Sequence, residues 1–136
     1  MEKSPATPAE RELYLKAAKT AHDMNRLYCV EINDPVQAPW DMLPEQKIES
    51  LLIGVAGIVA GNTPELSHAL WSMTHKQMGW TLGPVRDEEK KEHPNLRPYA
   101  ELPLQQRLKD TLFRTVVLGV LAANGLTLED PAKDGV

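Results

Sequence analysis

The chain has 136 residues, of which 42% are hydrophobic and 25% are charged, and its formal net charge is -4 at pH 7 with a pI near 5.5. This length suffices for one domain that buries roughly two-thirds of the surface exposed by its unfolded form. The mild acidity excludes the long-range positive field that draws proteins to nucleic-acid backbones, so any anion must be bound by a few placed donors.

Two further classes are disfavoured by the cysteine count and the apolar runs. Cys29 is the single cysteine and cannot form a disulfide within the chain, which favours a reducing compartment and a small core residue. The longest apolar run, from Leu51 to Ala60, is about half the length of a membrane span, and the N-terminus lacks an apolar stretch of signal length. We therefore expect a cytosolic protein without membrane contact.

The first predicted helix follows a disordered arm of residues 1–7. Thr7 can cap it, Pro8 suits its first position, and Glu10 can complete a capping box. The helix should run to about Cys29 or Val30. Its apolar residues recur at spacings of three and four and predict one buried stripe: Tyr14, Ala17, Ala18, Ala21, Met24 and Tyr28.

Turn residues between Glu31 and Trp40 predict a loop, after which Pro44 opens a second helix that ends at Gly61-Asn62. Gly54 and Gly57 lie inside this helix and suggest that another backbone approaches it there. Its wide apolar face predicts the central core helix: Ile48, Leu51, Leu52, Val55, Ile58 and Val59.

Thr63-Pro64 starts a third helix, and Pro103 opens a fourth that ends with Gly125 as a left-handed cap. The third helix should bury Leu66, Ala69, Leu70, Met73 and Met78, with His68, Trp71 and His75 on adjoining faces. Leu126 and Leu128 should then fold back over the core. The four helices predict an all-α fold in one domain over residues 8–131, with 132–136 as a tail; a short two-stranded pairing of the loops stays open.

An internal repeat divides the chain into two helix–loop–helix halves, about 8–61 and 63–131. Residues 39–46 (PWDMLPEQ) recur as residues 98–105 (PYAELPLQ), each copy before a long apolar helix and after a helix with a histidine, His22 or His68. Two unrelated helix starts with similar Leu-Pro chemistry are the alternative. Duplicated halves would face one another across a groove, and the first half has the shorter loop.

The second loop, about residues 79–102, is too long to be a simple connection, and its apolar residues favour an ordered binding loop over disorder. Trp80 lies in a glycine-bounded turn and is either a stacking platform for a purine or an aromatic plug at the end of the bundle. Trp40 and Trp71 fit the core better, though either can wall a groove.

Donors for phosphate oxygens are available at Arg26, Arg86 and Arg97, and two amides, Asn25 and Asn95, suit an adenine edge. The alternative for residues 86–92 is a solvated face of mixed charge. Catalytic signatures are absent: the sequence has no phosphate loop, no GxGxxG, no HExxH and no third ligand beside His68 and His75. We therefore expect neither an enzyme nor a bound cofactor or metal.

The long loop also resembles the RyR domain, the repeat found in ryanodine receptors and in small bacterial and phage proteins. The residues that carry the resemblance are Gly79-Trp80, the run Gly83-Pro84-Val85-Arg86-Asp87, His93-Pro94, Leu96, Pro98-Tyr99 and Leu102-Pro103. Weaker similarity extends from about Ala17 to Pro131 and includes Asn25-Arg26, Tyr28-Cys29 and Pro39-Trp40.

This resemblance implies a non-catalytic module that binds an adenine nucleotide or an ADP-ribose-derived messenger between its halves. It would sense or sequester the ligand in the cytosol of a bacterium or a phage-infected cell, in immune signalling. The implied ligand-binding residues are Trp80, Leu82, Arg86, Asn95, Arg97, Tyr99, Trp40, Asn25 and Arg26. Many members carry an aromatic at position 82 and a cysteine at position 95, which puts the choice of ligand in doubt. The alternative is an interaction module that docks a protein through the same loop, as a homodimer.

Overall fold

Residues 7–126 are described by the computed structural model, so the expectations for the arm before Thr7, for Leu128 and for the tail fall outside them. This part of the chain forms four α-helices, two short 3-10 helices and one pair of short strands, which confirms the mostly α-helical prediction. The elements are α1 (Pro8–Glu31), η1 (Trp40–Met42), α2 (Glu45–Val59), α3 (Pro64–Gln77), β1 (Thr81–Leu82), β2 (Glu92–His93), η2 (Tyr99–Glu101) and α4 (Leu104–Ala123).

The helix starts form as the sequence predicts. Thr7 Oγ1 accepts a hydrogen bond from the Glu10 N–H at 3.1 Å, and Glu10 Oε1 accepts one from the Thr7 N–H at 3.3 Å, which completes the capping box. Thr63 caps α3 by accepting a hydrogen bond from the Leu66 N–H at 3.2 Å. Helices α2 and α4 each begin after a proline and have no side-chain cap.

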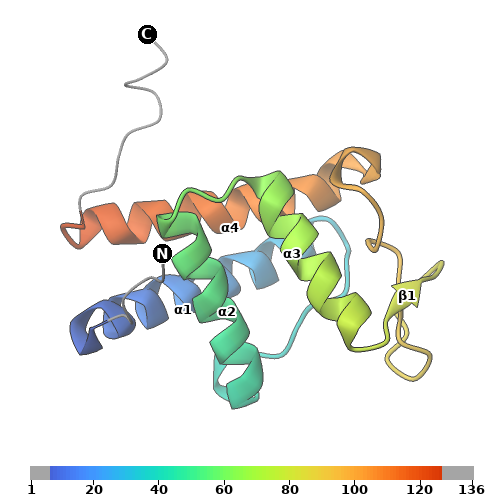
Figure 1. Cartoon of the computed structure of the whole chain (residues 1–136), viewed down its shortest axis with the longest axis horizontal. Coiled ribbons are helices and arrows are strands. Elements are labelled where there is room, and N and C mark those ends of the chain that lie inside the picture. The colour runs from blue at the N-terminus through green and yellow to red at the C-terminus, as the bar shows by residue number, and fades with distance from the viewer. Residues whose placement is uncertain (1–6, 127–136) are drawn as a thin grey trace, which may run out of the picture.

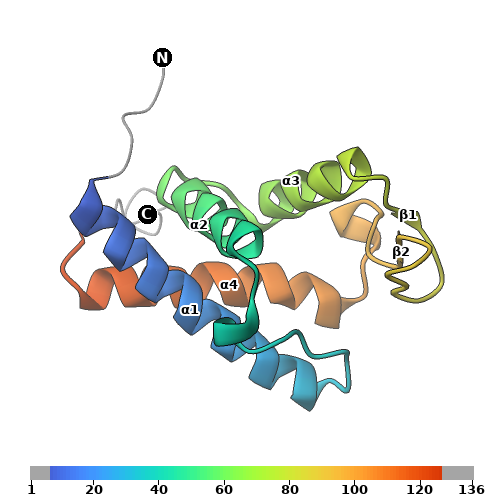
Figure 2. The same ribbon diagram turned by 90° about the horizontal axis from the view of Figure 1, so that it is seen from below.

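The helices lie in two layers (Figures 1 and 2). Helices α1 and α4 run side by side in opposite directions, and α2 and α3 cross them on one face. Alanines on α1 let its backbone come close to α4 and α2. Leu126 packs against the core, as expected for the start of the tail. The buried core consists of Ala17, Ala18, Ala21, Leu52, Val55, Ile58, Val117 and Leu121.

The predicted apolar stripe of α3 is wrong. Leu66, Leu70 and Met73 are 45%, 39% and 50% exposed, and the helix instead turns His68 and Trp71 inwards. The reason is that α3 packs mainly against α4 and η2, through ring contacts and a hydrogen bond of His68. The first helix shows the same shift, because Met24 is exposed while His22 is buried.

The glycines of α2 also have a different explanation from the predicted backbone approach. A Cβ at Gly54 would lie 3.4 Å from the Phe113 ring, and a Cβ at Gly57 would lie 2.5 Å from the Asn62 side chain. Side chains therefore occupy the space beside both glycines.

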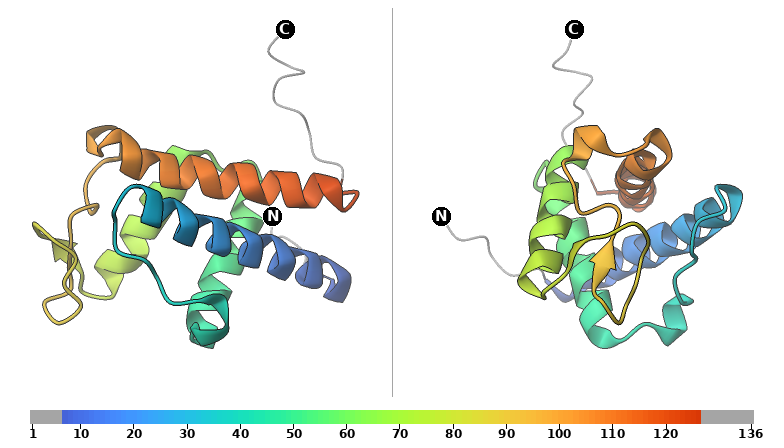
Figure 3. Two further views of the ribbon diagram at one scale, coloured as in Figure 1. Left: turned by 180° about the vertical axis from the view of Figure 1, so that it is seen from behind. Right: turned by 90° about the vertical axis from the view of Figure 1, so that its right-hand side faces the viewer.

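The long loop is ordered around a small parallel pairing of β1 with β2, in which Thr81 lies opposite Glu92. Gly83 is needed beside this pair because a Cβ there would lie 2.5 Å from the Glu92 Cβ. Trp80, Leu96 and Leu102 are buried along the loop. Figure 3 shows the loop projecting beyond the end of α3, next to the start of α4.

The predicted repeat is present in the backbone. Pro39 has φ/ψ of -58°/154° and Pro98 has -55°/143°, and each begins a short 3-10 turn. Pro44 has -64°/150° and Pro103 has -56°/149°, and each precedes a long helix. The two copies therefore share one path from the loop into the helix.

A buried histidine holds each copy in place. His22 Nε2 donates to the carbonyl of Ala38 at 2.7 Å, and His68 Nε2 donates to the carbonyl of Arg97 at 2.8 Å. Both carbonyls belong to the residue before the repeated proline. The two histidines are 3% and 5% exposed. These bonds fix the angle between the first helix of each half and the turn that follows it.

Ring packing and helix ends repeat as well. His22 lies 6.1 Å from the Trp40 ring, and His68 lies 5.9 Å from the Tyr99 ring, with interplanar angles of 58° and 55°. Helices α1 and α3 end in the same way: each is followed by a residue with positive φ, and the next N–H donates to the carbonyl five residues earlier. These residues are Asn33 (φ 57°) and Gly79 (φ 91°), with the Asp34 N–H donating to the Cys29 carbonyl at 2.9 Å and the Trp80 N–H to the His75 carbonyl at 3.0 Å.

We predict that His22→Leu destabilises the protein, because the substitution leaves the carbonyl of Ala38 without its buried donor. The free energy of unfolding should fall by roughly 1–3 kcal/mol, measured by urea denaturation. Ser50→Ala is the control, because it removes an exposed hydroxyl that donates to the Gln46 carbonyl on α2. A loss no larger than that of the control would contradict the anchoring role of His22.

Candidate functional site

A cleft of about 580 Å³ lies between the two halves. This volume is within the range of about 300 to 1,000 Å³ that small-molecule sites usually have. Its walls come from the second part of α1 and the loop after it, the first turns of α2 and α4, the inner face of α3 and the long loop. The residues discussed below as its lining are Asn25, Cys29, Asp34, Lys47, His68, Trp71, Arg86, His93, Asn95, Arg97, Gln106, Lys109 and Asp110.

Corresponding positions of the two halves face this cleft. His22 corresponds to His68 and Asn25 to Trp71, because each pair has the same spacing from its anchoring imidazole. Lys47 corresponds to Gln106 and Leu51 to Asp110, because each pair lies equally far behind the repeated proline. The predicted groove between the halves therefore exists, and each half lines it with different chemistry.

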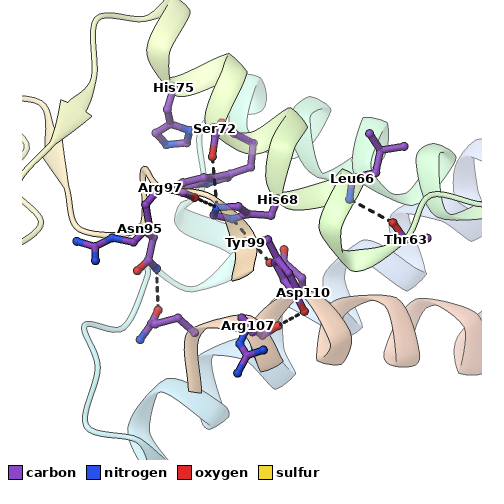
Figure 4. Close-up of polar contacts among 12 residues, drawn as sticks. Thr63, Leu66, His68, Ser72, His75, Asn95, Arg97, Tyr99, Arg107 and Asp110 are labelled. Carbon is purple, nitrogen blue, oxygen red and sulfur yellow. Dashed lines mark hydrogen bonds and ion pairs between the residues drawn. The ribbon is translucent and has the colours of Figure 1, made fainter. Parts of the chain in front are cut away.

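Figure 4 shows His68 pointing from α3 towards Arg97 and Asp110. Its Nε2 carries the proton donated to the Arg97 carbonyl, and its Nδ1 lies 3.9 Å from Asp110 Oδ2. Burial raises the pKa of Asp110 to about 7, although the charge of Lys109 opposes this. Near neutral pH the Asp110 carboxyl is therefore partly protonated and can donate as well as accept a hydrogen bond.

Trp71 forms an aromatic wall with three histidines. Its ring centroid lies 5.5 Å from that of His68, 4.3 Å from that of His75 and 4.9 Å from that of His93. His75 Nδ1 donates to the Trp71 carbonyl at 3.0 Å and so holds its own ring in place. Burial lowers the pKa of His75, and burial with the positive charge of Arg86 lowers the pKa of His93 to about 4. Both imidazoles on this wall are therefore uncharged at pH 7.

Hydrogen bonds join the long loop to α4 on another wall. Asn95 Nδ2 donates to Gln106 Oε1 at 2.7 Å, and Gln106 Nε2 donates to Asp34 Oδ2 at 3.4 Å. Lys109 forms an ion pair with the same Asp34 carboxylate. The Asn95 N–H donates to His93 Nδ1 at 3.1 Å. This network orients amide and imidazole groups at the cleft and neutralises the charge of Lys109.

The remaining cations of the cleft are less compensated. Arg86 Nη2 donates to Glu88 Oε1 at 2.9 Å in an exposed pair, and Arg97 Nε donates to the Pro94 carbonyl at 2.9 Å. Within residues 7–126, Lys47 forms neither an ion pair nor a side-chain hydrogen bond. The cleft therefore has an excess of positive charge, although the chain as a whole is acidic.

Four of the nine candidate residues line the cleft, and they come from both halves: Asn25, Arg86, Asn95 and Arg97. The other five lie elsewhere. Arg26 Nε donates to the Gln37 carbonyl at 2.9 Å and stabilises the first loop. Trp40 packs against the core, and Leu82 is 51% exposed on β1. Tyr99 lines a second hollow of about 620 Å³ between α3 and η2, where its hydroxyl donates to the Arg107 carbonyl at 3.4 Å.

The structure does not support Trp80 as a stacking platform. Its side chain is 8% exposed, and its ring lies 5.5 Å from the His75 ring and 6.3 Å from the His93 ring. An indole enclosed in this way offers no free face to a base. The second interpretation of Trp80, an aromatic plug at the end of α3, describes its position better, and its contacts place His75 and His93 beside Trp71.

Trp71, Lys47 and Asp110 were not among the candidates, yet all three line the cleft. Trp71 was the hardest to identify, because an aromatic residue at helical spacing usually belongs to a core. For Lys47 and Asp110, the internal repeat was the available signal. Each aligns with a residue of the other half, Gln106 and Leu51, that also lines the cleft.

The remaining chemistry of the cleft is limited. Cys29 is buried, and burial raises the pKa of its thiol, which disfavours the nucleophilic thiolate. Among the described residues, no group of three or more His, Cys, Asp or Glu side chains is placed to hold a metal ion. Across residues 7–126, no helix is both long enough and apolar enough to cross a bilayer.

We predict that Asp110→Asn makes the protein less sensitive to rising pH. The folded chain holds the Asp110 proton up to about pH 7, whereas the unfolded chain releases it near 3.8. Between these values the folded state binds more protons, so rising pH favours unfolding, by up to about 1.4 kcal/mol per pH unit. Urea denaturation from pH 4 to pH 8 should show Asp110→Asn gaining stability relative to wild type over this window. A pH-independent difference would contradict the assignment.

A family comparison agrees with this arrangement. Residues 56–130 match the sequence model of the RyR domain. The match starts inside α2 and includes α3, the long loop and α4, which is more than half of the chain. The first half lies mostly outside the match, and its likeness to the second half rests on the repeated histidine anchor and proline turns. The chain belongs to the RyR domain family.

Proposed function

We propose that the protein binds an adenine nucleotide or an ADP-ribose-derived nucleotide in the cleft between its halves, without catalysing a reaction. The observation that carries this proposal is the lining of the cleft, which combines one aromatic wall, several amides and an excess of cationic side chains in about 580 Å³. A nucleotide presents a flat base, a polar ribose and phosphates, and each of these parts has a complementary group in the cleft.

The aromatic wall suits the base. Trp71 is only partly buried and lines the cleft, and its contacts with the rings of His68 and His75 restrict the rotation of the indole. Stacking of a base on an aromatic side chain contributes about 1 to 3 kcal/mol. In the ligand-free protein the imidazoles of His75 and His93 beside this wall are uncharged at pH 7, because burial lowers the pKa of both.

Polar side chains at the cleft suit the edge of the base or the ribose. Asn25 lines the cleft opposite the Trp71 half and has both a donor and an acceptor. Asn95 and Gln106 are already oriented by their mutual hydrogen bond. The neutral form of Asp110 adds a donor that an ionised carboxylate lacks.

In this role the protein senses or sequesters its ligand in the cytosol of a bacterium or of a phage-infected cell, as part of immune signalling. Binding without turnover is consistent with the protonated thiol of Cys29 and with the use of the cleft histidines as packed, uncharged rings.

We predict that Trp71→Leu weakens nucleotide binding about 5- to 150-fold, which is the equivalent of losing one stacked base. Calorimetric titration with ATP, ADP, ADP-ribose and cyclic ADP-ribose isomers would measure this. Trp40→Leu is the matched control, because Trp40 lies outside the cleft lining and its replacement should leave affinity nearly unchanged. Equal affinities of Trp71→Leu and wild type, or no binding by any of these nucleotides, would contradict the proposal.

A second candidate function is protein association, and exposed apolar side chains favour it. They are not confined to the long loop, because Leu66, Leu70 and Met73 form a stripe along the outer face of α3. Leu82 and Val85 on the long loop are also exposed, at 51% and 65%. Exposed apolar surface that forms a contiguous patch often marks an interaction site, and the three residues of the α3 stripe are neighbours on one helix face.

If this surface joins two copies of the chain, Leu70→Glu should convert a dimer into a monomer. Light scattering coupled to gel filtration would report the mass at several concentrations. Ile53→Glu provides the control, since Ile53 is 72% exposed on α2 and lies away from the α3 stripe. A wild-type protein that remains monomeric at high concentration would exclude the homodimer.

A further inference from the structure

Lys47 occupies an unusual position for a lysine. It lies in the first turn of α2, is partly buried, and lines the cleft. Burial lowers its pKa, and the positive charge of Arg86 lowers it further, while Glu88 partly offsets this. Lysine side chains are rarely removed from water without a paired anion. Within residues 7–126, no carboxylate lies close enough to Lys47 to form an ion pair.

The groups around Lys47 share its charge or are neutral. Arg86 is held only by the exposed carboxylate of Glu88, and an exposed pair of this kind contributes little. Lys47 and Arg86 both lower the pKa of His75, and Arg86 and His75 both lower that of His93. Lys47, Arg86 and His93 line the same cleft, and the His75 ring, which is not part of the lining, has its centroid 6.4 Å from that of His93.

Hydrogen bonds orient the two imidazoles. His93 Nδ1 accepts from the Asn95 N–H, so its proton lies on Nε2, which is left as a donor. His75 Nδ1 is used by the Trp71 carbonyl, so its Nε2 can gain a proton when an anion is nearby. The ring centroids of His75 and His93 are 6.4 Å apart. The site therefore combines the side chains of Lys47 and Arg86 with two imidazoles that can gain a proton when an anion binds.

We propose that Lys47, Arg86 and His93, with the neighbouring His75, form the phosphate subsite of the cleft and bind a di- or polyphosphate group. Both imidazoles contact Trp71, at 4.3 Å and 4.9 Å between ring centroids, so one ligand can stack on the indole and place its phosphates here. The subsite needs both halves, because Lys47 comes from α2 and the other three residues come from α3 and the long loop. The subsite depends on the proposed function only for the identity of the base, because a phosphate group without a base should also bind there.

Proton uptake is a direct consequence of this arrangement. An anion between the four groups opposes the repulsion from Lys47 and Arg86 and raises the pKa of both imidazoles. The other charged groups that act on them are Glu88 on His75, and Lys109 and Asp34 on His93. The imidazole signals of His75 and His93 in NMR spectra should therefore move towards the protonated form when inorganic pyrophosphate is added at constant pH.

The decisive experiment compares Lys47→Gln with wild type against three probes: adenosine, ADP and inorganic pyrophosphate. Loss of a charge-assisted contact should weaken ADP and pyrophosphate binding about tenfold or more and leave adenosine binding within about twofold. Lys90→Gln makes the same change of charge on an exposed residue of the loop and should leave all three affinities unchanged. Lys47→Arg keeps the charge and should retain most of the binding, and thermal melts check that each variant is folded.

The outcomes separate this subsite from the proposed function. If adenosine does not bind but pyrophosphate binds and Lys47→Gln removes that binding, the subsite stands and the adenine assignment fails. If Lys47→Gln weakens adenosine as much as ADP, Lys47 only supports the cleft and the phosphate subsite is wrong. If neither ADP nor pyrophosphate binds, or if they leave the His75 and His93 signals unchanged in wild type, the subsite is also wrong.

Discussion

Each half of this protein depends on one hydrogen bond from a buried imidazole to the carbonyl before a proline. His22 and His68 make this bond at 2.7 and 2.8 Å. A buried imidazole N–H without an acceptor is costly, and the proline that follows the accepting carbonyl restricts the backbone. Together these constraints hold the loop against the first helix of the half and direct the chain into the second helix. The cleft lies between the two anchored turns.

The two halves share this framework but not their surface chemistry. At matching positions, the first half places Asn25 and Lys47 at the cleft, whereas the second half places Trp71 and Gln106 there. The symmetry is also incomplete in packing, because α1 lies along α4 and the corresponding pairing of α3 with α2 is not a main contact. A cleft with two different walls can bind an asymmetric ligand in one orientation, which a strictly symmetric groove could not do.

Because α3 lines the cleft with polar and aromatic groups, it buries little of its aliphatic surface. Its inner face carries His68 and Trp71, so much of its aliphatic surface remains exposed at Leu66, Leu70 and Met73. The α1–α2–α4 core must then supply most of the apolar burial. The long loop compensates in part, because Trp80, Leu96 and Leu102 form a small buried set that holds the loop to the end of α3.

The helices, the caps of α1 and α3, and the repeat could be predicted from the amino-acid sequence, because they depend on residues close together in the chain. The capping box at Thr7, the left-handed Gly125 and the paired Leu-Pro turns all follow from local backbone preferences. The sequence also identified Asn25, Arg86, Asn95 and Arg97, whose side chains reach the cleft.

Which aromatic side chain faces the cleft, and which faces of the helices are buried, depends on how the helices and the long loop pack together. Judged by residue type alone, Trp80 and Trp71 are equally able to stack on a base. Both contact the rings of His75 and His93, but the Trp80 side chain is buried, whereas Trp71 is partly exposed and lines the cleft. The same holds for Lys47, whose significance comes from lining the same cleft as Arg86, a residue in the other half. Such contacts between distant segments depend on how the halves pack, and local sequence patterns carry no record of that packing.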